Sequence, residues 1–367
     1  MARSDTAPDG SILDLFDSDL DHAVPPTSPS GPGGGGPGPG RPVDDDARRR
    51  RRKILALILA LVMLVAGAVI GWYLLNRKPL TELPGTRVVD MPTYKTSIYG
   101  LEAPLGVAVA PDGSTIYASH GGATAGVKVF NRDGREVRSL EFPADEPYHV
   151  PVYLTVAPNG NLYVGDRAAG EVYLFTPEGD YIERFIPQDS AITFSPLGVA
   201  VAEDGTLYIA DVASEEPKDH RILVFDANGL LLDTWGEGEL NYPNQLFLEG
   251  GSLYATDGNN GRLVVFDAEG TRSTLVSTGV GSGDLGLPRG LGIDDRGRIF
   301  VVDSTDHMVR MYTKGAQLTD QPEFAGSFGD VGINDGEFMF PNGLDVDDRA
   351  RIYITDRQNN RLQVWGF

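Results

Sequence analysis

Three polar side chains each follow a proline at nearly regular intervals in the second half of the chain. They are Asn244 after Pro243, Arg289 after Pro288 and Asn342 after Pro341. A guanidinium presents a planar fork of N–H donors that fits a carboxylate. After three earlier prolines the same place holds Leu105, Val152 and Leu197. The pattern predicts either a polar crescent in which Arg289 receives a carboxylate from a peptide or small molecule, or a water-filled channel without a specific ligand.

The composition excludes several kinds of chemistry. The 367 residues include no Cys, which excludes a disulfide scaffold, a thiolate zinc site, an iron–sulfur cluster and a Cys nucleophile. The formal net charge is −21, so nucleic acid, whose phosphates attract basic proteins, is not predicted as a partner. No Ser lies in a G-x-S-x-G context around Ser195, so a Ser nucleophile is not indicated there.

The prolines belong to a repeat that must position these side chains. Six prolines head similar segments at intervals of 45 to 53 residues: Pro104, Pro151, Pro196, Pro243, Pro288 and Pro341. Each segment holds two apolar runs joined by a turn such as Asp112-Gly113, which is typical of a β-hairpin. A third run follows, and a fourth, weaker one is visible at 231–236 and 324–329. Four strands per repeat, six times, predict an all-β fold, a six-bladed β-propeller.

The repeats resemble NHL repeats, a six-bladed family within the TolB-like propellers. The resemblance rests on the Pro, the Gly turn, an aromatic-x-x-Asp column and a closing Arg-rich strand. The Asp column contains Asp166, Asp211, Asp257, Asp303 and Asp356, and the Arg column contains Arg221, Arg262 and Arg361. The first repeat departs from the pattern, because His120 stands in its Asp column. The repeat places the loops that enter the first strands and those between the second and third strands on one face.

The resemblance also implies a candidate metal site on that face. Propeller lyases that resemble this fold hold zinc with His residues at the channel mouth, and similar lactonases bind calcium through Glu, Asn and Asp. His120 and His149, from neighbouring repeats, are the candidate ligands, with zinc or calcium as the ion, although the preferred interpretation of the sequence requires no cofactor. His220 and His307 share a repeat column with Asn360, so a role in forming a turn accounts for them.

The end of the chain makes a prediction about ring closure. Phe367 follows directly after the third strand of the sixth repeat, which would leave an open sheet edge. The segment 93–100, TYKTSIYG, resembles the fourth strands and precedes the first repeat. We therefore expect this N-terminal strand to complete the sixth blade.

The N-terminal region contains a predicted membrane anchor. Residues 54–75 carry no charge, and a helix of this length measures about 33 Å, enough to cross a bilayer core of roughly 30 Å. Six basic residues at 48–53 predict a cytoplasmic N-terminus and an external propeller in a single-pass protein of the cell membrane. The predicted organisation is a disordered cytoplasmic tail at 1–53, a transmembrane helix at 54–75, a tether at 76–91 and the propeller at 92–367. The Gly- and Pro-rich tail is a candidate for binding a cytoplasmic partner.

Two classes of function remain. One is a non-catalytic, membrane-anchored module that binds or senses a protein, peptide or small-molecule ligand on the loop-rich face. The other is an extracytoplasmic metal-dependent lyase or hydrolase. The sequence favours the first class, because no set of catalytic residues could be assigned.

Overall fold

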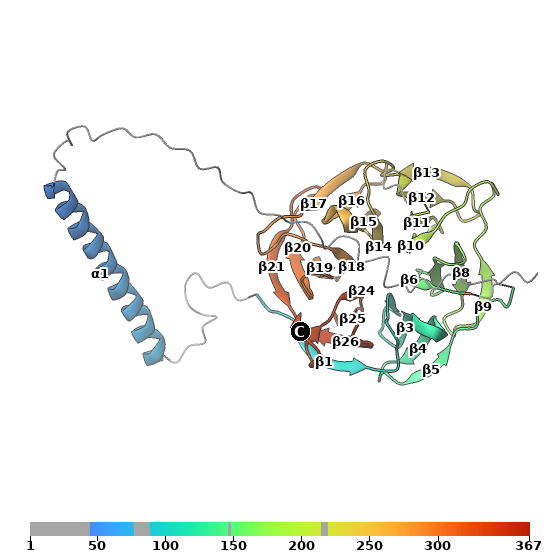
Figure 1. The fold of residues 1–367 in the computed structure, drawn as a ribbon, viewed down its shortest axis with the longest axis horizontal. Helices are drawn as coiled ribbons and strands as arrows, with labels where there is room; N and C mark the ends of the chain where they lie inside the picture. Colours follow the sequence, from blue (N-terminus) through green and yellow to red (C-terminus); the bar gives the residue numbers. More distant parts are fainter. Residues whose placement is uncertain (1–44, 77–88, 146–147, 214–218) are drawn as a thin grey trace, which may run out of the picture. The chain divides into compact units, whose positions relative to one another are not determined.

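The computed structural model describes residues 45–76, 89–145, 148–213 and 219–367. Residues 45–76 form one helix, α1 (Asp45–Asn76), and the second unit is a ring of six four-stranded sheets (Figure 1). The predicted all-β, six-bladed propeller is therefore confirmed. The predicted disordered tail up to residue 44 and the tether between residues 77 and 88 lie outside the described residues. Helix α1 begins at Asp45, so the basic residues 48–53, which we assigned to the tail, are helical.

The six blades follow one another along the chain. The first contains β2 (Val107–Val109), β3 (Thr115–His120), β4 (Gly126–Asn131) and β5 (Glu136–Ser139), and the second contains β6 (Pro151–Val156), β7 (Leu162–Asp166), β8 (Glu171–Phe175) and β9 (Tyr181–Arg184). The third contains β10 (Pro196–Val201), β11 (Leu207–Asp211), β12 (Arg221–Phe225) and β13 (Leu231–Trp235), and the fourth contains β14 (Pro243–Glu249), β15 (Ser252–Asp257), β16 (Arg262–Phe266) and β17 (Arg272–Val276). The fifth contains β18 (Pro288–Ile293), β19 (Arg298–Asp303), β20 (Met308–Thr313) and β21 (Glu323–Phe328). The sixth contains β24 (Pro341–Val346), β25 (Ile352–Asp356), β26 (Arg361–Gly366) and β1 (Thr93–Ile98). A short parallel pair, β22 (Asp330–Val331) and β23 (Glu337–Phe338), lies between the fifth and sixth blades.

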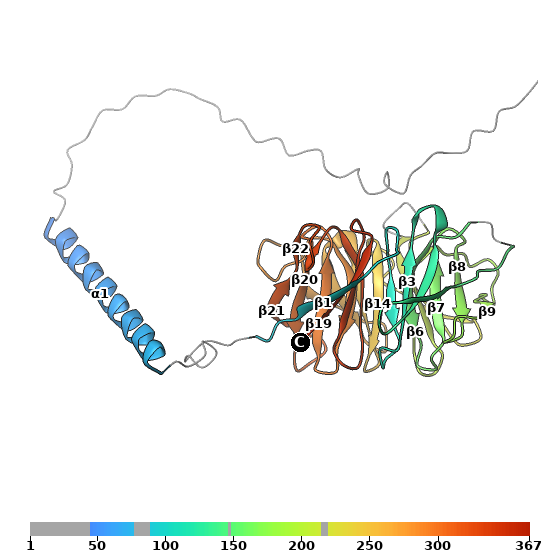
Figure 2. The ribbon, with the colours of Figure 1, turned by 90° about the horizontal axis from the view of Figure 1, so that it is seen from below.

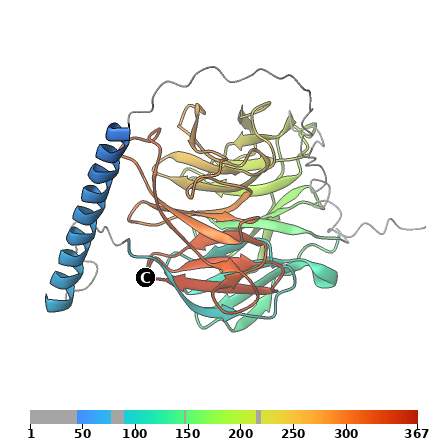
Figure 3. The same cartoon turned by 60° about the vertical axis from the view of Figure 1, so that its left-hand side comes forward.

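Ring closure follows the prediction from the sequence. Strand β1 pairs antiparallel with β26, from Thr93 opposite Gly366 to Ile98 opposite Leu362. In Figure 3 the cyan N-terminal strand accordingly lies beside the red C-terminal strand. The ring of 89–367 is thus closed by hydrogen bonds and side-chain packing between its two ends. This pairing also occupies the sheet edge that β26 would otherwise expose.

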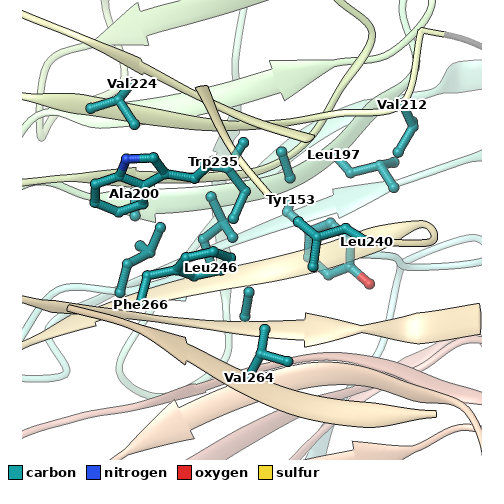
Figure 4. Packing of buried hydrophobic residues seen from close by; sticks show 14 of the residues in the cluster. Tyr153, Leu197, Ala200, Val212, Val224, Trp235, Leu240, Leu246, Val264 and Phe266 are labelled. Atoms are coloured by element: carbon teal, nitrogen blue, oxygen red, sulfur yellow. The ribbon is translucent and has the colours of Figure 1, made fainter. Parts of the chain in front are cut away.

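The core of the propeller lies between blades. One cluster joins the third and fourth blades through Trp235, Phe266 and Leu246 (Figure 4). The rings of Trp235 and Phe266 are stacked with their centroids 5.6 Å apart. Each blade packs one face against the blade before it and the other face against the blade after it, so side chains on both faces of its strands are buried. The connecting loops gather at the two faces of the ring (Figure 2), and loops on such a scaffold are where binding residues usually lie.

In the second to sixth blades, the buried Asp column joins the blade to the loop that enters it. In the third blade, Asp211 accepts the backbone N–H of Ser195 (2.9 Å) and the Nε of Arg221 (3.1 Å). Asp257 and Asp356 repeat this arrangement with Arg262 and Arg361. A buried carboxylate needs such partners, since an unpaired buried charge is strongly destabilising. The Asp and Arg columns of the repeat therefore have a structural explanation.

A bulge at the start of the innermost strand is repeated in five blades. In β10, Pro196 faces Asp211 but Val199 faces Ile209, so two strand residues occupy the place of one. The same shift occurs in β6, β14, β18 and β24. A bulge re-aims the side chains of its residues. We call the residue directly after the proline position 1 and the next residue position 2; both lie in the bulge, at the channel mouth on the loop-rich face.

Candidate functional site

The residues at position 1 do form part of a polar cluster. Arg289 is 5% exposed and Asn244 2% exposed. Arg289 donates from Nη1 to Oδ1 of Asn244 at 2.6 Å, across the junction between the fourth and fifth blades. Asn244 donates in turn from Nδ2 to the carbonyl oxygen of Tyr242 at 2.7 Å. The structure therefore brings two of the three predicted crescent residues into direct contact.

Asn342, the third predicted residue, is linked to the second blade, which is separated from its own sixth blade by the first. Its Oδ1 accepts a hydrogen bond from the hydroxyl of Tyr153 at 2.6 Å, although the two residues are 189 positions apart. Tyr153 comes from the second blade and crosses the mouth to reach the sixth. Burial raises the pKa of Tyr153, so its hydroxyl stays protonated and donates. The polar crescent thus continues across the mouth through a neutral phenol.

Position 2 explains why Tyr153 can reach so far. Four blades have glycine there: Gly106, Gly198, Gly290 and Gly343. A Cβ on Gly290 would lie 2.5 Å from the carbonyl oxygen of Asn342 in the next blade, so only glycine allows the inner strands to approach this closely. The two exceptions are Tyr153 and Gln245, whose side chains extend into the channel instead.

Gln245 forms the floor of the mouth. Its Nε2 donates to the carbonyl oxygen of Leu344 (2.6 Å), and its Oε1 accepts the backbone N–H groups of Leu344 (3.2 Å) and Leu291 (3.3 Å). The amide therefore bonds to the inner edges of β18 and β24, which have no neighbouring strand. Gln245 is 6% exposed, so this part of the channel is filled by protein. We call the channel mouth on the loop side of Gln245 the cup.

Two further arginines border the cup. Arg167 and Arg357 occupy the same repeat position, directly after the Asp column in the second and sixth blades. Arg167 donates from Nη2 to the hydroxyl of Tyr242 at 2.6 Å, and its guanidinium lies 5.5 Å from the centre of that ring. The pKa of Arg289 is lowered by burial; the phenols of Tyr153 and Tyr242 act to raise it, while the positive charges of Arg357 and Arg167 lower it further. Arg167 and Arg289 are therefore linked through Tyr242 and Asn244.

The rim of the cup contains residues with unusual backbone conformations. Tyr242 (φ 58°) and Phe340 (φ 49°) directly precede their prolines and adopt the left-handed region, which is costly for bulky residues. The backbone N–H of Tyr242 donates to Nδ1 of His220 (3.0 Å), and that of Phe340 donates to Nδ1 of His307 (2.9 Å). Each His therefore holds an aromatic residue at the rim.

In the sixth blade the side-chain amide of Asn360 takes the place of the His ring and accepts a backbone N–H in the same way. Asn360 accepts the backbone N–H of Ala103, which also has a positive φ (42°), at 2.8 Å. The turn-forming role predicted for the shared column of His220, His307 and Asn360 is confirmed. Acceptance at Nδ1 requires that the His be neutral, with its proton on Nε2.

The two candidate metal ligands, His120 and His149, have different surroundings. Nδ1 of His149 bonds Oδ2 of Asp166 at 2.7 Å, and the ring lies against Phe142, with 4.5 Å between centroids. His149 thus partners the Asp column, as Arg221 does in the third blade. His120 is buried, its Nδ1 has no hydrogen-bond partner, and burial lowers its pKa. Among the described residues, no three His, Asp or Glu side chains converge to hold an ion.

Sequence reasoning missed several members of the site. Tyr153 and Gln245 could have been found as the two breaks in the glycine column at position 2. Arg167 and Arg357 could have been found as the only arginines that directly follow the Asp column. Tyr242 had no such signal, because its position depends on a backbone conformation fixed by His220.

Comparisons with known proteins agree with the repeat and the fold. The family model described as "NHL repeat" matches residues 338–365. A probable peptidyl-alpha-hydroxyglycine alpha-amidating lyase of Caenorhabditis elegans is 30% identical over 188 residues, covering 48% of this chain and 52% of that protein. NHL repeat-containing protein 3 of Mus musculus is 26% identical over 176 residues, covering 44% and 49%. The chain thus spans about half the length of the curated relatives it matches.

Solved structures resemble the propeller at low sequence identity. A streptogramin B lyase structure aligns with a TM-score of 0.52 at 12% identity, covering 75% of this chain and 97% of that one. A catalytically inactive variant of virginiamycin B lyase from Staphylococcus aureus, with quinupristin, aligns with a TM-score of 0.52 at 15% identity, covering 76% and 100%. At this identity the likeness concerns the fold alone.

Proposed function

We propose that this protein is a membrane-anchored, extracytoplasmic NHL propeller that binds or senses a ligand through the cup at its channel mouth. The observation that supports the proposal best is the buried Arg289, which donates to Asn244 and is linked through Asn244 and Tyr242 to Arg167. Residues from four blades supply the cup, so any ligand there contacts a rigid scaffold. The ligand is an anionic group, such as a carboxylate of a peptide or small molecule.

The binding hypothesis is tested by removing the charge without removing the volume. We expect a panel of carboxylates and of peptides with free C-termini to include ligands that raise the melting temperature of the protein. Arg289→Met should abolish that rise. Arg349→Ala is the matched control, since Arg349 lies on the opposite face with 53% of its side chain exposed. Equal ligand-induced shifts in the Arg289→Met variant and the wild type would contradict the proposal.

The membrane anchor rests on helix α1. Its segment from Arg49 to Ile70 is long and apolar enough to span a membrane by length and composition. The basic residues 48–53 support a cytoplasmic N-terminus by the positive-inside rule. Protease added to intact cells or spheroplasts should then degrade an epitope in the propeller and spare one in the tail, and the reverse result would contradict this orientation. Any signal to the cell interior would pass through a partner of the tail.

A metal-dependent lyase or hydrolase is the alternative, favoured by the resemblance to the amidating lyase over 188 residues. Its test is elemental analysis of the purified protein. Stoichiometric zinc or calcium that is lost in a variant with His120→Ala and His149→Ala would favour the enzyme. Substoichiometric metal, unaffected by these substitutions, would favour the binding module.

A further inference from the structure

We propose that the face opposite the cup carries a binding site for a small zwitterion, such as a free amino acid, between two hairpin turns. The turns are 294–298 in the fifth blade, with the sequence DDRGR, and 347–351 in the sixth blade, with the sequence DDRAR. They connect β18 to β19 and β24 to β25, so they lie at the far end of the inner strands from the prolines. This site is separate from the cup and does not depend on it.

A cavity of about 190 Å³ is lined by the two turns. Pockets that take drug-sized ligands enclose roughly 300–1,000 Å³, so this cavity is limited to a small molecule. Asp294 and Ala350 form part of its wall. The rest is formed by the second Asp and the first Arg of each turn, which are Asp295, Arg296, Asp348 and Arg349.

The first Asp and the last Arg of each turn hold the turn in place. In the sixth blade, Oδ1 of Asp347 accepts the backbone N–H groups of Arg349 (3.0 Å) and Arg351 (2.9 Å), and its Oδ2 pairs with Nη2 of Arg351 (2.7 Å). Asp294 makes the same three contacts in the fifth blade. Both of these Asp residues are buried. The cavity therefore lies between two turns that are each fixed by a buried carboxylate.

The second Asp and the first Arg have no such structural role. Asp348 and Arg349 have side chains 51% and 53% exposed, and the ion pair between them is 4.0 Å long. Asp295 and Arg296 are also exposed, and no ion pair of either side chain is found within the described part of the chain. The hairpins do not need these side chains to close. No Arg is present in the corresponding turns of the other four blades, 111–114, 158–161, 203–206 and 249–252.

The four exposed side chains match a ligand that carries both charges. Two carboxylates and two guanidiniums have no net charge, so the cavity favours neither a simple anion nor a simple cation. A single exposed ion pair contributes little. A zwitterion presents an ammonium to the carboxylates and a carboxylate to the guanidiniums, so it gains several such contacts at once. A free amino acid has both groups on one carbon and is small enough for the cavity.

Binding can be measured by ligand-observed NMR titration of the full-length protein in neutral detergent. The probes are L-alanine and L-glutamine, together with the amide and the N-acetyl derivative of each, which lack one of the two charges. We expect at least one of the two amino acids to bind. Both of its derivatives should bind about fivefold more weakly or worse, because each loses the ion pairs of one charge. The proposal is overturned if neither amino acid binds, or if a derivative binds as tightly as its parent.

Two variants assign the binding to the cavity. Arg296→Gln and Asp348→Asn each remove one charge from one turn, and each should weaken binding about threefold or more. The matched controls are Arg135→Gln and Glu203→Gln, which remove exposed charges from turns on the same face in the first and third blades and should leave binding unchanged. All four positions are exposed, so the variants should fold with nearly the stability of the wild type. Binding that is unchanged in both cavity variants would place the ligand elsewhere and overturn the proposal.

The two binding sites can be tested independently. Carboxylates without an ammonium lack one of the two charges, and peptides of several residues are too large for the cavity, so neither is expected to bind there. Arg349→Ala therefore remains a control for the cup. Failure of the amino acids to bind would leave the proposed function of the cup unaffected.

Discussion

Ile98 provides a test of how the ring is closed. It is 4% exposed on β1, the outer strand of the sixth blade. Its side chain packs in a cluster that includes Leu362 of the sixth blade and Phe130 of the first, and it also lies against Gly134, at the turn before β5. Truncating a buried Ile to Ala costs about 2–5 kcal/mol, depending on how far the site can collapse. Since Ile98 packs across the junction between the first and last blades, we expect Ile98→Ala to lower the free energy of unfolding by about 3 kcal/mol.

The assay is urea denaturation of the wild type and two variants, followed by tryptophan fluorescence. Val137→Ala is the control, because Val137 is also a β-branched residue on an outer strand, β5, but is 63% exposed. A substitution at such a surface position usually changes stability by less than about 0.5 kcal/mol. In thermal unfolding, about 2–3 °C per kcal/mol converts the expected loss into a decrease of roughly 6–9 °C in the melting temperature.

The reasoning would be refuted if Ile98→Ala destabilised the protein no more than Val137→Ala. A protein that begins at Leu101 gives a second measure, since it lacks the whole of β1 and exposes the edge of β26. It should aggregate or melt well below the full chain. Equal stability of the two proteins would mean that β1 does not hold the ring closed.

Three further predictions concern the rim, the channel and the inner strands. Burial lowers the pKa of His307, and its Nδ1 must be unprotonated to accept the N–H of Phe340, so stability should fall as pH drops below about 6.5. His307→Asn should reduce this loss. A difference in melting temperature between the variant and the wild type that stays constant from pH 7.5 to 5 would contradict the prediction. Burial raises the pKa of Asp345 to about 7, so the folded state favours the protonated acid and loses stability as pH rises from about 4 to 7. Asp345→Asn should therefore be more stable than the wild type at pH 8, by up to a few kcal/mol, and equal to it at pH 4, as measured by urea denaturation. Gly290→Ala should cost about 1–3 kcal/mol through overpacking against Asn342, and full stability in the melting assay would show that the inner strands can separate.

The blade architecture could be predicted because each repeat depends on residues that are close together in the sequence. Each hairpin needs only neighbouring residues, a turn such as Asp112-Gly113 and apolar runs that alternate on either side. The Asp column could be recognised for the same reason, since Asp211 bonds to residues within its own repeat. The closing strand β1 was also predictable, because an unpaired edge after Phe367 required a partner and TYKTSIYG resembled the fourth strands.

The candidate site was only partly predictable. The spacing of the repeats identified position 1, and hence Arg289, Asn244 and Asn342. It did not predict which of these side chains would be in contact. The candidate metal site was predicted from a resemblance and stays a prediction, and the structure adds that Nδ1 of His149 bonds to Asp166. A His in one repeat can replace the Arg of another as a partner of the same Asp. The residue type alone does not distinguish this structural role from a metal ligand.

The sequence by itself determined the number of blades and the columns that build them, because both depend on local patterns repeated along the chain. It also indicated how the two ends meet, because the segment 93–100 resembles the fourth strands of the repeats. Only the tertiary structure decided which side chains share the mouth. Tyr153 and Asn342 are 189 residues apart and meet because the ring brings the second and sixth blades to one axis. The bulge turns their side chains inward, and the exceptions to glycine at position 2 decide what fills the channel. These contacts join different positions of different repeats, so the periodicity of the sequence does not predict them.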